Sequence, residues 1–420
     1  MTKNKKVIVV GAGIGGLTTA LYLHRAGYNV QIYESVKTIK ELGVGINLLP
    51  HSVRILWDLG LQEALDQSAI RTKELVYYNK FGQLIWQEAR GIDAGYHWPQ
   101  YSLHRGRLQG ILLNEVKQVI GEDCVHTGMH LSHVEQHNKK VQASFIDRSN
   151  EQQLEVVECD FLIGADGIHS AMRKQLYPQN DKPIYGGRIL WRGMTKAKPF
   201  LSGRTMIMAG NIDEKFVAYP ITAPDHSGYC DINWIAELSV TEAPDRNEWN
   251  RLANIADFAH TFQDWTFDWL DVPSLISGAE YVYEFPLVDK EPLPKWSFNR
   301  VTLLGDAAHP MYPIGSNGAS QAILDAEALY VSLIENQSIE EALLDYEQQR
   351  IHKTASIVRS NRQHGPEIVM QMVHERAPQG FERLEDVITY AELEEISNRY
   401  KQIAGFHKEK LNQVGMKVSQ

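Results

Sequence analysis

Cysteine is scarce in this chain of 420 residues, which has three. Cys124, Cys159 and Cys230 are scattered, and no two of them form a CxxC pair. That spacing excludes the dithiol-using oxidoreductases and any cysteine-rich metal site, because both need paired thiols. We therefore expect three buried thiols in a cytoplasmic protein that holds no metal.

Long hydrophobic runs are also missing. No window contains about 18 uninterrupted apolar residues, so we expect no membrane-spanning helix. The N-terminus mimics a signal peptide, because Lys3, Lys5 and Lys6 precede an apolar segment. That segment is rich in glycine and ends at His24-Arg25 without a small-residue cleavage site. We interpret it as a strand, a turn and a helix.

A concentrated basic region is absent as well: the formal net charge is −10. Nucleic-acid binding by counterion release needs a basic surface, so we expect no nucleic-acid partner. Hydrophobic residues make up 43% and charged residues 22% of the chain. These values are close to the globular average and exclude a disordered or fibrous protein. The length predicts two or three domains.

A glycine-rich turn stands near the N-terminus between two strand patterns. Val7 to Val10 is an apolar run typical of a buried parallel strand, and Gly11, Gly13 and Gly16 then complete a GxGxxG before a helix pattern. The next strand pattern ends at Glu34. Such glycines let a pyrophosphate approach the helix N-terminus, and the acidic residue accepts hydrogen bonds from ribose hydroxyls. The combination predicts a dinucleotide site; the alternative is a glycine-rich turn without a nucleotide.

A second turn from strand to glycine lies far downstream, between Arg300 and Asp325. The apolar run Val301 to Leu304 ends at Gly305-Asp306, and a helix pattern follows from Ala319 to Ile334. The loop between them is punctuated by Pro310, Pro313, Gly315 and Gly318. A chain with this order offers backbone N–H groups to an anionic ligand. We expect one elongated dinucleotide to bridge the two turns.

Three shorter features lie between the two turns. Gly45 interrupts the strand-like segment LGVGINL. A glycine inside a strand indicates either that a ligand approaches closely or that the strand has a bulge. Arg105 opens a helix pattern, where its charge opposes the helix dipole, so either a bound phosphate or a solvated surface position explains it. Asp166 follows the buried strand pattern Phe161 to Gly164, and Arg173 comes shortly afterwards.

The sequence pattern changes from Lys182 onward. From Lys182 to Pro286, aromatic residues recur in alternating runs without βα alternation, which predicts an antiparallel or mixed sheet with a helical insertion near Trp249 to Leu270. From Ile339 to Tyr400 the pattern is helical and broken at Pro366 and Pro378. The predicted fold class is α/β: a Rossmann-like domain, a mixed or antiparallel sheet domain and C-terminal helices.

Three motifs carry a resemblance to a known family. In order, they are GAGIGG with Glu34, LIGADGIHSAMR and LLGDAAHPMYPIGSNGASQAILDA. They resemble the single-component FAD-dependent aromatic hydroxylases, the para-hydroxybenzoate and salicylate hydroxylase group. PQYSLHRGRLQGILL, WRG at 191–193 and AYPI at 218–221 look like the phenazine monooxygenase branch of that group. The resemblance runs from Val7 to Arg362.

The resemblance implies a discontinuous FAD-binding domain at 1–75, 101–181 and 287–338, a substrate-binding sheet domain at 76–100 and 182–286, and a helical region at 339–420. It places the GxGxxG on the pyrophosphate, Glu34 on the adenosine ribose, and Arg105 and Asp306 near the phosphates and ribityl chain. Asp166 and Arg173 belong to a motif shared with a transient nicotinamide site. The predicted cofactor-binding residues are Gly11, Gly13, Gly16, Glu34, Gly45, Arg105, Asp166, Arg173, Asp306, Gly315, Gly318 and Ser320.

The resemblance also implies the chemistry. NADH or NADPH reduces FAD, O2 forms a flavin C4a-hydroperoxide, and an aromatic or N-heteroaromatic small molecule is hydroxylated, with loss of CO2 where the attacked carbon carries a carboxylate. Pro313 and His309 are predicted at the reacting centre, His309 as a proton relay or as a structural residue. Arg192 is a candidate partner for a substrate carboxylate. The predicted substrate-binding residues, each of which could instead belong to the core, are Trp191, Arg192, Met206, Tyr219, Trp234 and Tyr283.

Two positions depart from the family pattern. Many relatives have Asn where Ser320 stands, and some have an arginine near the position of Glu41, so the choice between NADH and NADPH stays open. Two alternatives remain: a flavoprotein oxidoreductase without oxygen insertion, and a non-catalytic flavin-binding protein. Flavin halogenases rank low because WxWxIP is missing from the sequence. The expected partners are the small aromatic substrate and O2, and the expected state is a monomer or homodimer.

Overall fold

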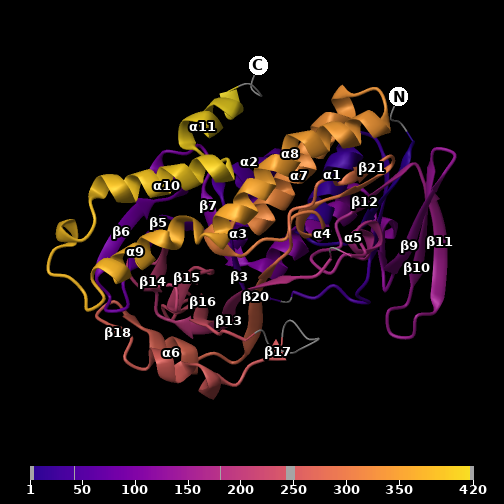
Figure 1. Ribbon diagram of the computed structural model, residues 1–420. Helices are drawn as coiled ribbons and strands as arrows, with labels where there is room; N and C mark the ends of the chain where they lie inside the picture. Colours follow the sequence, from indigo (N-terminus) through magenta and orange to yellow (C-terminus); the bar gives the residue numbers. More distant parts are fainter. Residues whose placement is uncertain (1–3, 42, 180, 243–250, 417–420) are drawn as a thin grey trace.

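A computed structural model describes residues 4–41, 43–179, 181–242 and 251–416 (Figure 1). Its first sheet has six strands in the order β21-β22-β12-β1-β2-β8. All neighbours pair in parallel except β21 with β22. The strands are β1 (Lys6–Val10), β2 (Asn29–Glu34), β8 (Val125–Thr127), β12 (Phe161–Gly164), β21 (Ser297–Phe298) and β22 (Val301–Leu303).

The strands before the three motif turns are neighbours in this sheet. β12 pairs with β1 on one side and with β22 on the other, and all three run in the same direction. Their residues are almost completely buried, as expected for short apolar runs covered on both faces. Because parallel strands end at one edge of the sheet, the turns after Val10, Gly164 and Leu303 lie side by side there.

Helices cover the parallel sheet. α1 (Ile14–Arg25) packs against α4 (Arg105–Val119) and α7 (Gly318–Glu335), and α7 in turn contacts α2 (Pro50–Asp58) and α8 (Ile339–Arg362). The remaining helices on this side are short: α3 (Gln62–Ser68) and α5 (Ala171–Leu176). Two three-stranded sheets accompany them: β3 (Gly45–Leu48), β7 (Gln100–His104) and β4 (Ile70–Thr72), and the meander β9 (His130–His137), β10 (Lys140–Ile146) and β11 (Gln153–Cys159).

The second large sheet has eight strands in the order β17-β20-β13-β16-β15-β14-β5-β6. β14 and β5 are parallel, and the other neighbours are antiparallel. This mixed sheet confirms the predicted fold class. Its strands are β5 (Glu74–Tyr78), β6 (Leu84–Ala89), β13 (Ile184–Ala197), β14 (Thr205–Gly210), β15 (Glu214–Pro220), β16 (Cys230–Ser239), β17 (Arg251–Leu252) and β20 (Val282–Asp289).

The helical insertion expected near Trp249 to Leu270 is wrong. Trp249 lies outside the described residues, and the described remainder forms the 3-10 turns η3 (Ile255–Asp257) and η4 (Ala259–Phe262) and the hairpin β18 (Thr266–Phe267) and β19 (Leu270–Asp271). Phe258, Phe262 and Trp265 recur at helical spacing, but all three are buried against the second sheet. The helix of this region is α6 (Val272–Ser277), which Asp271 caps.

The C-terminal helices lie along the second sheet. α9 (Ile368–Arg376) contacts β6, and α10 (Tyr390–Ala404) contacts α8; in Figure 1 both are at the left, with α11 (Lys408–Met416) above them. The breaks fall near Pro366 and Pro378, as predicted. In the part of the chain that the structure describes, no helix is long and apolar enough to cross a membrane. The boundaries of the three predicted regions stay a prediction.

Candidate active site

A cavity of about 440 Å³ lies between the edge where the motif turns meet and one face of the second sheet. This volume is in the ordinary range for a small-molecule site. One wall consists of Gly13 to Gly15, Gly45 to Asn47, Arg105, Ala165, Gly167, Ile168, Leu304 to Asp306, Met311, Pro313, Ile314, Ser316 to Ala319 and Ala322. The opposite wall comes from the sheet and includes Leu190, Arg192, Met206, Met208, Lys215, Val217, Tyr219, Ile235 and Glu237.

The first glycine turn leaves a helix N-terminus open to this cavity. Gly11 has a φ of +103°, and a Cβ there would lie 2.4 Å from the carbonyl oxygen of Ala165. A Cβ at Gly16 would lie 2.0 Å from the carbonyl oxygen of Gly11. A Cβ at Gly13, by contrast, would meet no atom of the described residues within 4 Å. Two glycines therefore permit close backbone packing, and the third leaves room for an anion at the start of α1.

Glu34 fixes its carboxylate beside the same turn. Its Oε2 accepts the backbone N–H of Ala12 at 2.8 Å, and its Oε1 accepts the N–H of Val36 at 3.0 Å. Glu34 is the last residue of β2, next to β1 in the sheet. This position fits the predicted contact with a ribose, because the carboxylate stands at the edge of the pyrophosphate turn.

Asp306 and Arg105 bring opposite charges to the cavity wall. Asp306 lies in η5 (Gly305–Ala307), where its side chain is exposed to the cavity. Burial raises the pKa of Asp306, while His309 and Arg105 act in the opposite direction. Arg105 is the first residue of α4, with its N–H donated to the carbonyl of Val44. Both side chains fit a ligand that carries hydroxyl and phosphate groups.

The loop from Pro313 to Gly318 forms the cavity wall next to α7. Pro313 is exposed to the cavity, and Gly315 has a φ of +66°. A Cβ at Gly318 would meet nothing within 4 Å among the described residues, so the N-terminus of α7 is also accessible. The cavity wall therefore has two accessible helix N-termini, those of α1 and α7, and a loop that contains proline and glycine. This arrangement fits the predicted path of FAD.

Gly45 joins the two walls. Its N–H donates to Oδ1 of Asn233 at 2.6 Å, and its carbonyl accepts Nη2 of Arg192 at 3.0 Å. A Cβ at Gly45 would lie 2.6 Å from the side chain of Asn233, so a larger residue would force the sheet away.

Arg173 and Asp166 support the site from outside the cavity wall. The guanidinium of Arg173 is fully buried and donates to the carbonyls of Ala308 and Glu291 at 3.0 and 2.9 Å. Asp166 accepts the N–H of Ala171 at 2.8 Å with its Oδ2, and burial raises its pKa. Arg173 thus holds the turn after β22, and Asp166 holds the first turn of α5, with its Oδ1 left without a partner among the described residues. Neither residue is in the cavity wall, and their contacts with the cofactor stay a prediction.

Ser320 also lies outside the wall. Its hydroxyl is buried, 2.9 Å from the hydroxyl of Ser52, and accepts the N–H of Leu49 at 3.3 Å. Ser320 is on the side of α7 that packs against α2. Ser320 thus attaches α7 to α2, and its predicted place along the flavin ring stays a prediction.

His309 belongs to a buried charge network behind the turn. Its Nε2 lies 2.6 Å from Oδ2 of Asp325, whose Oδ1 accepts Nε of Arg350 at 2.7 Å. Oδ2 of Asp325 also accepts the N–H of Gly305 at 3.0 Å. Burial opposes the charge of Asp325, but His309 and Arg350 outweigh burial and lower its pKa to about 2. These contacts fit the structural role of the two roles predicted for His309, and the proton-relay role stays a prediction.

The six predicted substrate residues separate by strand face. Arg192, Met206 and Tyr219 are in the cavity wall. Trp191 and Trp234 point to the other face, where Trp191 stacks on Phe258 and Trp234 donates to the hydroxyl of Thr195. Tyr283 is opposite Arg192 in the β20–β13 register but is not in the wall. Alternation along a strand explains the split, because Trp191 and Arg192 are adjacent residues.

Sequence reasoning missed an ion network in the sheet wall. Lys215 Nζ lies 2.9 Å from Oε2 of Glu237 and 2.5 Å from Oε2 of Glu367, and Arg188 Nη1 lies 2.6 Å from Oε1 of Glu237. Burial opposes the charge of Lys215, but the two glutamates raise its pKa overall. Lys215 and Tyr219 are separated by an even number of positions on β15 and so share a strand face. The alternation of side chains along β15 could therefore have indicated that Lys215 faces the cavity.

Comparisons with known proteins agree with this geometry. Residues 4–361 match the family model described as an FAD binding domain. A phenazine 1,6-dicarboxylic acid hydroxylase, PhzS, from Lysobacter antibioticus is 42% identical over 361 residues, covering 85% of this chain and 89% of that protein. Salicylate hydroxylase from Pseudomonas putida is 31% identical over 78% of this chain and 77% of its own length.

A solved structure supports the same fold. The Klebsiella pneumoniae protein HpxO, in complex with FAD and uric acid, superposes with a TM-score of 0.71 at 22% identity, covering 97% of this chain and 95% of that one. The matches confirm the predicted family, cofactor and class of enzyme. The chain belongs to the family of FAD-dependent aromatic hydroxylases and is an FAD-dependent monooxygenase.

Proposed function

We propose that this enzyme uses NADH or NADPH and O2 to hydroxylate an N-heteroaromatic carboxylic acid. The observation that carries the proposal is Arg192, which is in the cavity wall and pairs with no carboxylate among the described residues. Arg192 is partly buried, and a guanidinium in such a wall without a counter-ion favours an anionic ligand. The relative from Lysobacter antibioticus, named for a phenazine dicarboxylic acid, supports the same class of substrate.

We propose that Gly13 and Gly318 leave the helix N-termini open for FAD, and that Asp306 and Arg105 contact its ribityl and phosphate groups. When bound, FAD takes up the reducing equivalents and activates O2 for transfer to an aromatic ring. The protein itself holds the ring of the substrate beside Pro313 and excludes water. The apolar side chains of Leu190, Val217 and Ile235 in the sheet wall suit that second task.

Tyr219 is the candidate for holding a proton in this wall. Burial raises the pKa of Tyr219 to about 12, although Arg192, its hydrogen-bond partner, acts in the opposite direction. The phenol is therefore neutral at physiological pH and can donate its proton in a hydrogen bond to a hydroxyl or ring nitrogen of the substrate. We propose that Tyr219 and Arg192 orient the substrate together.

The experiment is turnover of a defined panel by purified holoenzyme. NADH and NADPH oxidation is measured with phenazine-1,6-dicarboxylate, salicylate and a ring without a carboxylate. We expect the heteroaromatic acid to accelerate oxidation most, and the product to carry one added oxygen or oxygen in place of CO2. Hydrogen peroxide without an oxygenated product, across the panel, would instead favour a flavoprotein oxidoreductase. Flavin that neither nucleotide reduces would favour the non-catalytic alternative.

We propose a cytoplasmic location and a monomer or homodimer. The location is supported by the three cysteines, which are buried as free thiols and therefore suit a reducing compartment.

A further inference from the structure

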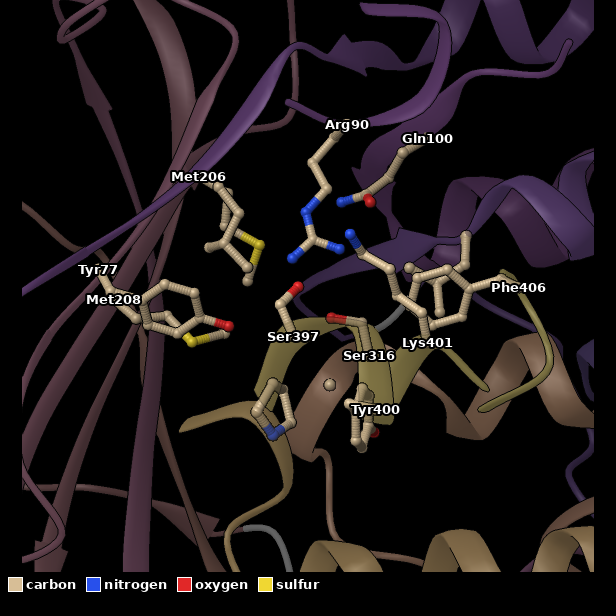
Figure 2. Close-up of a pocket in the computed structure, with 14 residues that line it drawn as sticks. Tyr77, Arg90, Gln100, Met206, Met208, Ser316, Ser397, Tyr400, Lys401 and Phe406 are labelled. Atoms are coloured by element: carbon tan, nitrogen blue, oxygen red, sulfur yellow. The ribbon is translucent and has the colours of Figure 1, made fainter. Parts of the chain in front are cut away.

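A second, smaller pocket lies beside the active-site cavity, under the C-terminal helices (Figure 2). We call it the distal pocket. Its volume is about 20 Å³, enough for one water-sized group. The side chains of Met206 and Met208 and the residue Ser316 line both the distal pocket and the active-site cavity, so these three residues separate the two spaces.

Three polar groups in the distal pocket have no hydrogen-bond partner among the described residues. They are the hydroxyl of Tyr77, Nε of Arg90 and Oε1 of Gln100. The side chains belong to residues that are 2%, 9% and 3% exposed. Figure 2 shows the guanidinium of Arg90 and the hydroxyl of Tyr77 pointing toward the centre of the pocket. Buried polar groups normally have partners, so the two donors, the Tyr77 hydroxyl and Arg90 Nε–H, indicate a ligand that accepts hydrogen bonds. Gln100 Oε1 is itself an acceptor and does not pair with such a ligand.

Charge in the distal pocket favours an anion. Glu88 Oε2 lies 2.9 Å from Nη2 of Arg90, and Glu88 Oε1 accepts the hydroxyl of Ser397 at 2.8 Å and pairs with Lys401. Burial opposes the charge of Glu88, but Arg90 and Lys401 lower its pKa, so it is ionised. Two cations therefore face one carboxylate. Glu367 is the other carboxylate near Tyr77, and Lys215 neutralises it.

We propose that the distal pocket binds a carboxylate at the far end of a multi-ring aromatic substrate, with Arg90 and Tyr77 as the residues that recognise it. The inference rests on the proposed function, because it extends the same substrate site. Arg90 Nε–H and the Tyr77 hydroxyl are two unpartnered donors, and a carboxylate accepts from both.

The strand order sets the length of that substrate. Tyr219 is on β15 in the active-site cavity, and Tyr77 is on β5, two strands farther along the sheet with β14 between them. Tyr77 is level with Met208 and Val217, so it is also offset from Tyr219 by two residues along the strands. At the usual strand spacing and rise the separation is about 12 Å. Two or three fused rings cover that distance, and a single-ring acid does not. Because the distal pocket as it stands holds only one water-sized group, a carboxylate enters it when Met206 and Met208, on β14 between the two sites, move aside. Methionine side chains adjust readily enough for this.

Ligand titrations of the FAD-loaded enzyme, read from the change in the flavin absorbance spectrum, test the inference without turnover. The probes are phenazine-1,6-dicarboxylate and its uncharged diamide, titrated into the wild type, Arg90→Gln and Tyr77→Phe. Arg25→Gln is the matched control, because Arg25 pairs with Asp58 at the surface. We expect Arg90→Gln to raise the Kd of the dicarboxylate about tenfold or more and Tyr77→Phe to raise it about threefold, with the Kd of the diamide unchanged.

The outcomes separate this inference from the proposed function. If the wild type oxidises NADH or NADPH with the dicarboxylate but Arg90→Gln and Tyr77→Phe leave its Kd unchanged, the distal pocket holds only water and the inference is wrong. An equal rise in Kd for both probes also overturns it, since that indicates a general packing effect. If no aromatic acid perturbs the flavin of the wild type, the proposed function fails and the inference falls with it. Tyr77→Phe should fold normally, because it removes a hydroxyl that has no partner among the described residues. Its Kd therefore tests the inference even if Arg90→Gln does not fold.

Discussion

The hydroxyl of Tyr400 lies 2.1 Å from the point where a Cβ at Gly315 would be placed. This relationship joins the last long helix of the chain, α10, to the loop that forms the floor of the predicted flavin site. The same hydroxyl donates to the carbonyl of Ile314 and accepts Nδ2 of Asn317 at 2.8 Å. The C-terminal helices are therefore part of the site, although the family model ends at residue 361.

Removing the Tyr400 hydroxyl should loosen this loop. Tyr400→Phe removes the acceptor of the bond from Asn317 and the single hydroxyl proton, which the carbonyl of Ile314 and Oδ1 of Asn361 share, all buried. Hydrogen bonds of this kind contribute about 1 kcal/mol each, so we expect about 1–2 kcal/mol less stability. FAD should also bind more weakly, which titration of the apoprotein measures. Tyr390→Phe, at an exposed position of the same helix, is the control and should change neither quantity.

The sequence was sufficient for the backbone of the site and insufficient for its side chains. Glycine requirements are local, so Gly11 and Gly16 could be assigned from the turn alone. Arg173 and Ser320 sit in the expected motifs, but their side chains point into the protein, and a motif does not specify direction. Tyr400 could not be found at all, because its contact with Gly315 spans 85 positions and depends on tertiary packing.

The residues of the second sheet also show why side-chain directions could not be predicted from the sequence. Trp191 and Trp234 are large and aromatic, which made them attractive as pocket residues, but they pack on the opposite face. Lys215 and Glu237 are charged and would ordinarily be assigned to solvent, yet each is 4% exposed. The sequence shows which residues of a strand share a face, because side chains alternate between the two faces. Which of the two faces lines the cavity depends on the elements packed on each side.

Trp234→Phe and Tyr219→Phe should therefore behave differently. Trp234 is fully buried, so its truncation should lower the free energy of unfolding by about 1–3 kcal/mol and leave kcat/KM near the wild-type value. Tyr219→Phe should fold normally and lose up to about tenfold in kcat/KM, because it removes the proposed hydrogen bond to the substrate. Chemical denaturation and steady-state kinetics measure the two effects. Equal kinetic losses in both variants would contradict the assignment of strand faces.

The Lys215 network predicts a large stability effect. Lys215→Met leaves Glu367 without its 2.5 Å partner and Glu237 with Arg188 alone, in a buried environment. Breaking a buried ion pair from one side costs about 3–5 kcal/mol. Urea unfolding of the variant measures the loss. Lys196→Met, which removes the exposed pair with Asp225, should cost less than about 1 kcal/mol. The double variant Lys215→Met, Glu367→Gln should recover part of the loss, since it also removes an unpaired charge.

The depressed pKa of Asp325 predicts how stability depends on acid. Its pKa falls from an ordinary 3.8 to about 2 in the folded protein, because His309 and Arg350 favour the carboxylate against the cost of burial. The folded state therefore binds this proton less readily than the unfolded state does. The resulting stabilisation is complete above about pH 5 and is lost as the pH falls toward about 2, by about 2 kcal/mol. Asp325→Asn cannot titrate, so the difference in unfolding free energy between the wild type and this variant should shrink over that interval. Tyr390→Phe, at an exposed position that does not titrate in acid, should show a constant difference. A constant difference for Asp325→Asn as well would exclude the buried His309–Asp325–Arg350 network as an acid-sensitive element.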